Sequence, residues 1–397
     1  MELARRVLAI KPSPTLALNA KAKALAAQGV DVVGFAAGEP DFDTPDFIKD
    51  AAIQALQEGF TKYTATAGIP ELRAAICAKL KADNGLAYTP EQVLVSTGAK
   101  HSLYNIFQAL LNDGDEVIIF SPYWVSYPDM VRLAGGVPVI VQTEEETGFA
   151  PDPAALKRAL TPKTRAIVIN SPGNPTGAVL SDEALRGIAD AIRDHDCLVI
   201  TDDIYERLLY TDKPFHNIVN VAPELTPRVV VVNGMSKAFS MTGWRLGYAA
   251  GPKELIAAMQ MIQDQSTSNA NSITQKAGVA ALQGPPDAVN AMVKEFEARR
   301  RMFVAGLNEI PGVRCRMPEG AFYVFPNVTG LLAKKYKGEP IRWSVHLSEI
   351  LLADFRVAAV PGAPFGAEGY LRMSFAASRE TIEKGLSRLR DLAAALS

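Results

Sequence analysis

The chain has 397 residues, which is enough for two domains, and its 48% hydrophobic content supplies a large buried core. Its 41 basic and 43 acidic residues nearly cancel, so no overall charge favours a nucleic acid or an anionic membrane as a partner. The three cysteines form no CxxC pair, no histidines cluster at metal-ligand spacing, and no apolar run suits a secretion signal or a membrane span. A cytoplasmic protein without a metal site fits these features best.

The first predicted element is an amphipathic helix that ends at about residue 58. Thr44 is expected to be its N-cap and Pro45 its first helical residue, because these residue types favour those positions. We expect this helix to begin a large domain that covers residues 46–290.

Five β-branched runs then alternate with helical patterns between about residues 91 and 250. They cover residues 92–95, 116–120, 166–169, 197–200 and 229–232. Continuous apolar runs between helices indicate an α/β fold with a mainly parallel sheet covered on both faces. Polar or Gly-rich motifs follow each run directly, and ligands bind outside the carboxyl ends of such strands. We therefore expect five motifs to converge on one site.

The pattern changes after about residue 290. A charged helix is predicted at 294–307, followed by shorter strand-like pieces that include 321–325 and 371–375. We expect residues 291–397, joined by residues 1–45, to form a smaller second domain.

The basic run at residues 299–301 admits two interpretations. It could bind a polyanion, but glutamates precede Arg299 and Arg301 by four residues, which is the spacing of helical ion pairs. A solvated helix face is the preferred interpretation.

Lys237 is the most informative residue of the chain. It follows the apolar run 228–232, small residues precede it, and Arg245 lies eight positions further on. A lysine amine in this setting suits a Schiff base with a carbonyl cofactor, and the rigid guanidinium of Arg245 suits a phosphate on that cofactor. The alternative, a surface lysine, is disfavoured by the buried strand before it.

Gly98, Ala99 and Lys100 follow another run and begin a helical pattern. Because backbone N–H groups and the dipole at a helix start favour anions, this turn predicts a phosphate site.

In their order and spacing, these motifs resemble those of the class I aminotransferases, which are fold type I pyridoxal-phosphate enzymes. The resemblance extends from Ser13 to Ser374 and is greatest to bacterial aspartate aminotransferases with a lysine after Thr-Gly-Ala. It implies pyridoxal 5′-phosphate as the cofactor, a seven-stranded sheet between helices, and a homodimer with shared active sites.

The resemblance also implies roles around the cofactor ring. Lys237 would form the Schiff base and later move the proton between the substrate α-carbon and the cofactor. Asp202 would pair with the pyridine nitrogen and keep it protonated. Its neighbour Asp203 would point elsewhere and be structural.

Three further residues would contact the ring. Tyr205 and Asn174 would donate hydrogen bonds to the phenolic oxygen and stabilise its charged form. Trp124 would stack on the ring, the alternative being an aromatic residue of the core.

At the phosphate, the resemblance assigns the countercharge to Arg245 and backbone contacts to residues 98–100. Tyr63 resembles a tyrosine that reaches the phosphate in the neighbouring subunit, and a plain loop aromatic is an equal alternative. Gly234 stands where many relatives have a hydroxyl, and Ser236 is the candidate to replace it.

The substrate α-carboxylate would bind to Arg372 through two parallel hydrogen bonds. Gly38 would make room for this carboxylate, and Asn174 and Trp124 would complete the site. The alternative for Arg372 is a half-exposed strand arginine.

The distal carboxylate of a dicarboxylic substrate would meet Lys100 together with Ser13 and Thr15 of an N-terminal arm. This arm is expected to be mobile without substrate and to close over it. In the competing interpretation, Lys100 serves only the phosphate and the side-chain pocket is apolar.

The expected function is amino transfer from L-aspartate to 2-oxoglutarate, with prephenate as an additional acceptor. An aromatic or alanine-type aminotransferase of the same fold is the first alternative. A β-lyase, which would release pyruvate and ammonia, is the second. A cofactor sensor fused to a DNA-binding module is disfavoured, because neither a helix-turn-helix pattern nor a basic stripe is evident.

Overall fold

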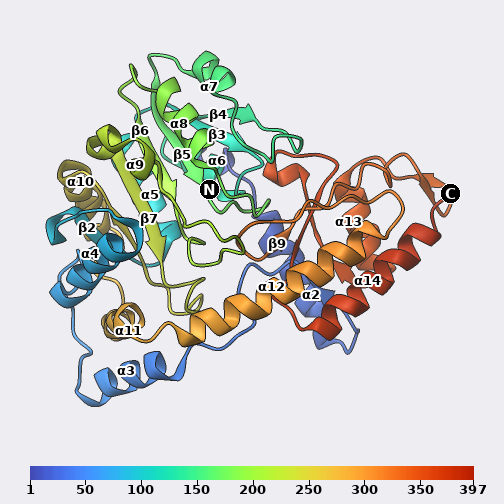
Figure 1. Ribbon diagram of the computed structural model, residues 1–397, viewed down its shortest axis with the longest axis horizontal. Helices are drawn as coiled ribbons and strands as arrows, with labels where there is room; N and C mark the ends of the chain where they lie inside the picture. The colour runs from blue at the N-terminus through green and yellow to red at the C-terminus, as the bar shows by residue number, and fades with distance from the viewer.

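The largest element of the fold is a seven-stranded sheet with the order β2-β8-β7-β6-β5-β3-β4, seen in a computed structural model that describes residues 1–397 (Figure 1). Only β8 runs antiparallel to its neighbours, which confirms the predicted α/β fold with a mainly parallel sheet. The strands are β2 (Val93–Ser96), β3 (Glu116–Ser121), β4 (Val137–Gln142), β5 (Thr164–Asn170), β6 (Leu198–Asp202), β7 (Val229–Gly234) and β8 (Gly247–Ala250). The five predicted runs are β2, β3, β5, β6 and β7, whereas β4 and β8 were missed.

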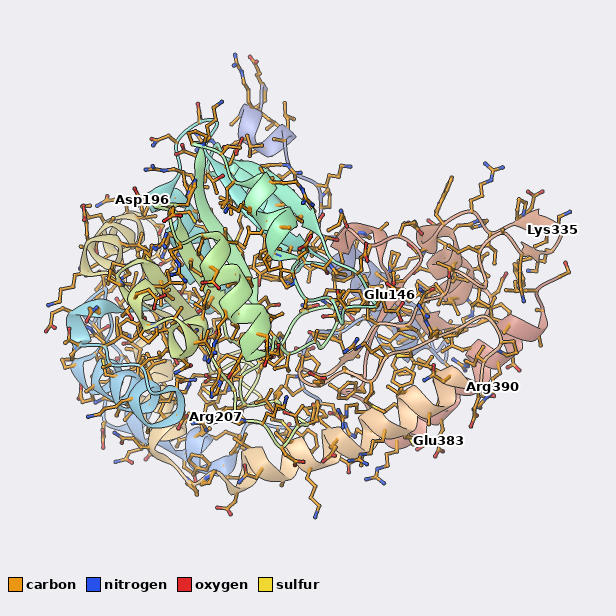
Figure 2. All side chains as sticks on the ribbon, turned by 45° about the horizontal axis from the view of Figure 1, so that its top comes forward. Glu146, Asp196, Arg207, Lys335, Glu383 and Arg390 are labelled. Atoms are coloured by element: carbon orange, nitrogen blue, oxygen red, sulfur yellow. The ribbon has the colours of Figure 1, made fainter.

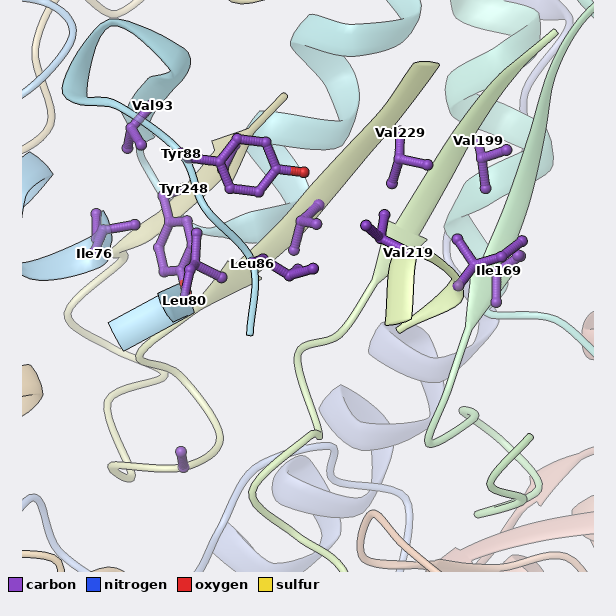
Figure 3. Packing of buried hydrophobic residues seen from close by; sticks show 14 of the residues in the cluster. Ile76, Leu80, Leu86, Tyr88, Val93, Ile169, Val199, Val219, Val229 and Tyr248 are labelled. Atoms are coloured by element: carbon purple, nitrogen blue, oxygen red, sulfur yellow. The ribbon is translucent and has the colours of Figure 1, made fainter. Parts of the chain in front are cut away.

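Both faces of this sheet are covered by helices. Successive side chains of a strand point to opposite faces, and accordingly Val231 joins one apolar cluster while Val230 and Val232 join another. The first cluster, part of which is shown in Figure 3, includes residues of α3 (Asp46–Gln57), α4 (Pro70–Asn84), α7 (Pro153–Ala159), α8 (Asp182–Ala191), α9 (Ile218–Val221) and α11 (Ser272–Gln283). The second includes residues of α5 (Ala99–Leu110), α6 (Ser126–Leu133) and α10 (Lys253–Asp264). Short 3-10 turns η1 (Pro90–Gln92) and η2 (Pro223–Arg228) precede β2 and β7.

A second region is built from both ends of the chain. The long helix α12 leads from the sheet toward α13 and α14, and the N-terminal helix α2 lies beside them (Figure 1). Strand β1 near the N-terminus pairs in parallel with β12 near the C-terminus. The elements are α1 (Arg5–Leu8), α2 (Pro14–Ala27), β1 (Val33–Gly34), α12 (Asp287–Asn308), β9 (Tyr323–Val324), β10 (Lys335–Tyr336), β11 (Glu339–Pro340), α13 (Ser344–Ala353), β12 (Val357–Ala358), β13 (Val360–Pro361), η3 (Ala363–Phe365), β14 (Leu371–Ser374) and α14 (Arg379–Ala394). The domain boundaries at 45/46 and 290/291 stay a prediction.

Two local predictions were wrong. Thr44 does not cap α3, because its hydroxyl donates to the Ser240 carbonyl at 2.7 Å and accepts from the Trp244 indole at 2.9 Å. The charged helix α12 begins at Asp287, seven residues earlier than predicted.

The basic run on α12 is only partly solvated. Arg301 is exposed and pairs with Glu297 at 2.5 Å, as the spacing predicted. Arg299 is buried, however, and pairs with both Glu295 and Asp41. Arg300 is also buried and donates to a backbone carbonyl at 2.6 Å. Two of the three arginines are therefore buried against other parts of the protein, and the run as a whole is not a solvated helix face.

Charged side chains elsewhere extend outward from the ribbon, as the labelled Lys335, Glu383 and Arg390 illustrate (Figure 2). None of the helices combines the length and the apolar character that a bilayer span requires.

Candidate active site

A cavity of about 350 Å³ lies at the carboxyl ends of the parallel strands and is also lined by residues of α2 and β14. Thirteen of the fifteen predicted site residues line it: Ser13, Thr15, Gly38, Ala99, Lys100, Trp124, Asn174, Asp202, Tyr205, Ser236, Lys237, Arg245 and Arg372. Gly98 lies directly beside Arg245. Tyr63 is outside the cavity, and its side chain is 92% exposed.

Lys237 lies just after β7 and points into the cavity. Its Nζ donates to the carbonyl of Gly38. Burial, together with the positive charges of Arg372 and Arg245, lowers the pKa of Lys237 to about 8. A lysine with this pKa is neutral far more often than an exposed one, which makes its nitrogen a better nucleophile and base.

Asp202 ends β6 and is buried at the cavity wall. Its Oδ2 accepts a hydrogen bond of 2.6 Å from the hydroxyl of Tyr127, and its Oδ1 accepts one of 3.4 Å from the backbone of Ile204. Burial raises the pKa of Asp202 to about 6 in spite of these bonds. No cation forms a salt bridge with it, so the carboxylate could still bind a positively charged group of a ligand.

Arg372 on β14 is the most deeply buried charge of the site, with 2% of its surface exposed. Its Nη1 donates to Asn174 Oδ1 at 3.1 Å and its Nη2 to the Ala36 carbonyl at 2.8 Å. The guanidinium also lies 4.5 Å from the ring of Tyr323 and 5.2 Å from that of Phe365.

No carboxylate forms a salt bridge with Arg372, and its Nε has no hydrogen-bond partner. A buried, uncompensated cation is costly unless an anion completes it. This arrangement excludes the alternative that Arg372 is only a half-exposed strand arginine. It leaves the guanidinium of Arg372 available to a carboxylate ligand.

The hydroxyl of Tyr205 lies 2.9 Å from that of Tyr323, so the two rings form one polar wall of the cavity. Trp124 contacts Tyr127 edge-on at 5.3 Å.

A backbone cradle closes one end of the cavity. Gly98 has a φ of 84° and precedes α5, whose first N–H groups have no acceptor within the helix. A side chain at Gly98 would meet Arg245 Nη2 at 2.6 Å, and one at Gly247 would meet the backbone of Ala99 at 2.2 Å. The close backbone contact and the nearby guanidinium suit a phosphate.

Gly234, where the resemblance led us to look for a hydroxyl, has no room for one. A Cβ there would lie 2.8 Å from the Leu246 carbonyl and 2.9 Å from the Cα of Gly247. Ser236 does line the cavity, and its hydroxyl makes no hydrogen bond to protein, so it is available to a ligand.

Another part of the cavity lining comes from α2 and from Lys100, the second residue of α5. Ser13 caps α2 by accepting from the Leu16 backbone at 3.5 Å, and the hydroxyl of Thr15 is buried without a partner. The ammonium of Lys100 lies 4.9 Å from the ring of Trp124, and burial lowers its pKa.

Eleven cavity residues were missed from the sequence, among them Asn19, Glu39, Tyr127, Asn170 and Tyr323. Asn170 stood at the start of a motif that was noticed, and its side chain accepts from the Asn174 backbone at 2.9 Å. Glu39 adjoins the predicted Gly38. Asn19, Tyr127 and Tyr323 carry no local signal, because they reach the cavity from separate elements.

Within the cavity, the four cations Lys100, Lys237, Arg245 and Arg372 outnumber the two carboxylates Glu39 and Asp202. The α/β fold and this site therefore suit an enzyme for small anionic ligands, with a lysine amine inside its cavity.

Comparisons with known proteins identify the family. The family "Aminotransferase class I and II" matches residues 30–389. The chain is 47% identical to the aspartate/prephenate aminotransferase of Nitrosomonas europaea over 99% of this chain and 100% of that protein. It is also 47% identical to the aspartate aminotransferase of Geobacillus stearothermophilus over 98% of each.

Solved structures agree with this assignment. The aspartate aminotransferase of Rhizobium meliloti has a TM-score of 0.97 at 42% identity over all of both chains. That of Thermus thermophilus with maleate has a TM-score of 0.92 at 46% identity, over 99% of this chain and 100% of the other. The chain belongs to the class I and II aminotransferases.

Proposed function

We propose that this aminotransferase uses pyridoxal 5′-phosphate and moves the amino group between L-aspartate and 2-oxoglutarate, with prephenate as an additional acceptor. The observation that carries the proposal is the buried guanidinium of Arg372, which lacks an anionic partner and shares its cavity with a second, separate cation, Lys100. Two such cations suit the two carboxylates of a dicarboxylic substrate. The names of the relatives, aspartate and aspartate/prephenate aminotransferase, support aspartate and prephenate among these substrates.

The residues of the cavity fit this cofactor. The N-terminus of α5 and Arg245 would hold its phosphate, with Ser236 as an additional donor. Asp202 would pair with the ring nitrogen, and Trp124 would stack on the ring. When bound, the cofactor supplies a carbonyl carbon for the substrate amine and a ring that accepts electrons.

Asp202 would contribute electrostatically. A carboxylate about 4 Å from a positive ring nitrogen, at an effective dielectric near 20, stabilises it by about 4 kcal/mol. Tyr205 and Asn174 would orient the ring from the side of its phenolic oxygen. The contact with Tyr323 holds the hydroxyl of Tyr205 in place.

Lys237 would move the proton during amino transfer. With a pKa of about 8, its Nζ can both take a proton from the substrate α-carbon and return it near neutral pH. The Gly38 carbonyl, which accepts from this amine, keeps Nζ at the centre of the cavity. Arg372 and Asn174 would fix the substrate α-carboxylate so that the α-hydrogen faces Lys237.

A first test mixes the cofactor-loaded protein with single amino acids and follows the absorption of the bound cofactor. Amino transfer from aspartate and glutamate, without any keto acid present, would support the proposal. Transfer from aromatic or small apolar amino acids alone would favour the rival specificity. Release of pyruvate without conversion of the cofactor to its amino form would favour a β-lyase.

Replacing Lys100 with alanine is expected to lower kcat/KM for aspartate by about tenfold, because one charged contact to the distal carboxylate is lost. Alanine as the amino donor should be unaffected, since it has no distal carboxylate. Steady-state kinetics with both donors provides the measurement, and Lys81→Ala on the exposed side of α4 is the control. Equal losses for both donors would place Lys100 at the phosphate instead.

The raised pKa of Asp202 predicts a pH-dependent difference in stability between the wild type and Asp202→Asn. This pKa is raised from 3.8 to about 6 in the folded protein, so between these values the folded state binds a proton that the unfolded chain does not. The ligand-free protein should therefore gain stability relative to Asp202→Asn as the pH falls from 7 through 6 toward 4, by up to about 3 kcal/mol.

Urea unfolding of both ligand-free proteins across this pH range measures the effect. Because a cationic ring would hold Asp202 ionised, cofactor binding should weaken over the same range in the wild type but not in the variant. A stability difference independent of pH would contradict the raised pKa.

We also propose a homodimer and a cytoplasmic location. The exposed ring of Tyr63 and an open depression beside Arg245, lined also by Asn271 and Thr274, support the dimer. A second subunit could cover both. The location rests on the cysteine usage of the chain.

A further inference from the structure

The segment that carries Asp202 and Tyr205 has a second, buried polar face. Asp202, Ile204 and Tyr205 line the active-site cavity, whereas Asp203 and Glu206 do not. Both of these carboxyls are nevertheless buried, on the side that faces α4 and α9. The proposed reaction makes no use of them, so their presence in the interior requires another explanation.

Glu206 is held by two side chains from the end of α4. The ammonium of Lys79 contacts Glu206 Oε1, and the amide of Asn84 donates to Oε2 at 2.7 Å. Lys79 also donates to Asn84 Oδ1 at 2.7 Å, which closes a triangle of hydrogen bonds. The side chains of Lys79 and Glu206 are only 4% and 7% exposed, so water cannot replace these contacts.

Asp203 is held in a similar way from the other side. Its Oδ2 accepts from the amide of Asn217 at 2.7 Å, and the same amide donates to Thr201 at 2.9 Å. Burial and the negative charge of Glu206 raise the pKa of Asp203. The backbone of Asp203 donates to Val232 on β7 at 2.9 Å, which ties the segment to the strand that leads to Lys237.

The surroundings of these contacts are largely apolar. The apolar cluster of Figure 3 includes Leu80, which follows Lys79, and Tyr248, which lines the same small space as Lys79 and Glu206. In such a low-dielectric setting a satisfied ion pair resists displacement, and breaking one partner leaves a buried charge without compensation.

Glu206 is the residue after Tyr205, and its backbone closes a turn by donating to the Asp203 carbonyl at 2.9 Å. A shift of either anchored carboxyl would therefore turn Asp202 and Tyr205 as well.

We propose that Lys79, Asn84 and Glu206 are positioning residues for the reaction, because they anchor the 202–206 turn from behind and so fix how Asp202 and Tyr205 meet the cofactor. This inference rests on the proposed function. A displacement of about 1 Å at a reacting group can lower a rate by about 100-fold, so anchoring from outside the cavity has a measurable effect.

The test uses the cofactor-loaded protein and three variants. Glu206→Gln keeps the shape and leaves Lys79 without its carboxylate. The double variant Lys79→Met, Glu206→Gln removes both charges, and thus keeps the experiment informative if the single variant fails to fold. Arg207→Gln is the matched control, because Arg207 is adjacent in sequence and pairs with Asp83 at 2.6 Å, with side chains that are 25% and 39% exposed.

In both Glu206 variants we expect kcat for aspartate to fall about tenfold to 100-fold, with KM changed less than about twofold, since Arg372 lies on a different element. The pH at which the absorption of the bound cofactor changes should also shift, because Tyr205 and Asp202 set the charge of the ring. The control should leave kcat and the absorption titration as in the wild type.

A merely structural role would lower the melting temperature and leave both the absorption titration and kcat unchanged below that temperature, and this result would overturn the inference. Equal effects in Arg207→Gln would overturn it too. If instead the wild type itself neither binds the cofactor nor transfers amino groups, the proposed function fails, and this outcome is distinct from a failure of the anchor.

Discussion

Replacing Lys237 with alanine is expected to lower kcat for amino transfer by about 10⁴-fold, the upper range for loss of a positioned general acid–base group. The amine is the only group of the cavity that combines a pKa of about 8 with a place beside the Gly38 carbonyl. No other lysine except Lys100 lines the cavity, and the ammonium of Lys100 lies over the ring of Trp124. Single-turnover kinetics with aspartate provides the measurement.

A second measurement tests covalent attachment independently of turnover. Borohydride reduction of the loaded wild type followed by mass spectrometry should show the cofactor attached to the peptide that contains Lys237. In Lys237→Ala the attachment should be absent. Lys276→Ala, on α11 and paired with Glu71 at 3.0 Å, is the control. Attachment at another lysine, or a variant with more than about a tenth of the wild-type rate, would show that Lys237 does not have this role.

Replacing Arg372 with methionine should produce the second-largest effect. Truncating one partner of a buried, hydrogen-bonded charge pair costs about 2–5 kcal/mol, which corresponds to a loss in kcat/KM of about 30-fold to several thousand-fold. The loss should be the same for aspartate, glutamate and alanine, because all three present an α-carboxylate. Arg372→Lys should lose less than the methionine variant, since it keeps the charge but not the planar pair of donors.

Ligand-dependent stability checks the same role without catalysis. Maleate, a dicarboxylate, should raise the melting temperature of the wild type by mass action and leave that of Arg372→Met unchanged. The variant also loses the hydrogen bonds to Asn174 and Ala36, so only the difference with and without maleate is informative. Arg314→Met, at an exposed position paired with Glu145, is the control. A kinetic loss confined to dicarboxylates would assign Arg372 to the distal carboxylate.

The central strands could be predicted from the sequence because they are buried on both faces and therefore read as continuous apolar runs. The edge strand β4 contains Pro138 and is partly exposed, so it lacks that pattern. Strand β8 consists of Gly247, Tyr248 and two alanines. Its place comes from antiparallel pairing with both β2 and β7, which local propensity does not reveal.

The predicted site residues shared a different property, since each followed a strand or stood in a short motif. Tyr127, Tyr323 and the Lys79–Glu206 pair have no such marker. They meet their partners across 75, 118 and 127 positions of sequence. Thr44 shows the opposite case, in which a valid local rule was overridden because Ser240 and Trp244 offered its hydroxyl better partners.

The close contacts of Gly98, Gly234 and Gly247 affect how this enzyme can diverge. A methyl group at Gly98, Gly234 or Gly247 would collide with backbone or with Arg245, so the start of α5, which is the proposed phosphate anchor, and the loop of Lys237 are tightly packed against each other. The cavity is also lined by side chains from α2 and by that of Lys100, which can be exchanged without changing the backbone of that unit. New substrate preferences would therefore be acquired by changes at residues 13–19 and 100, while the type of reaction is inherited unchanged.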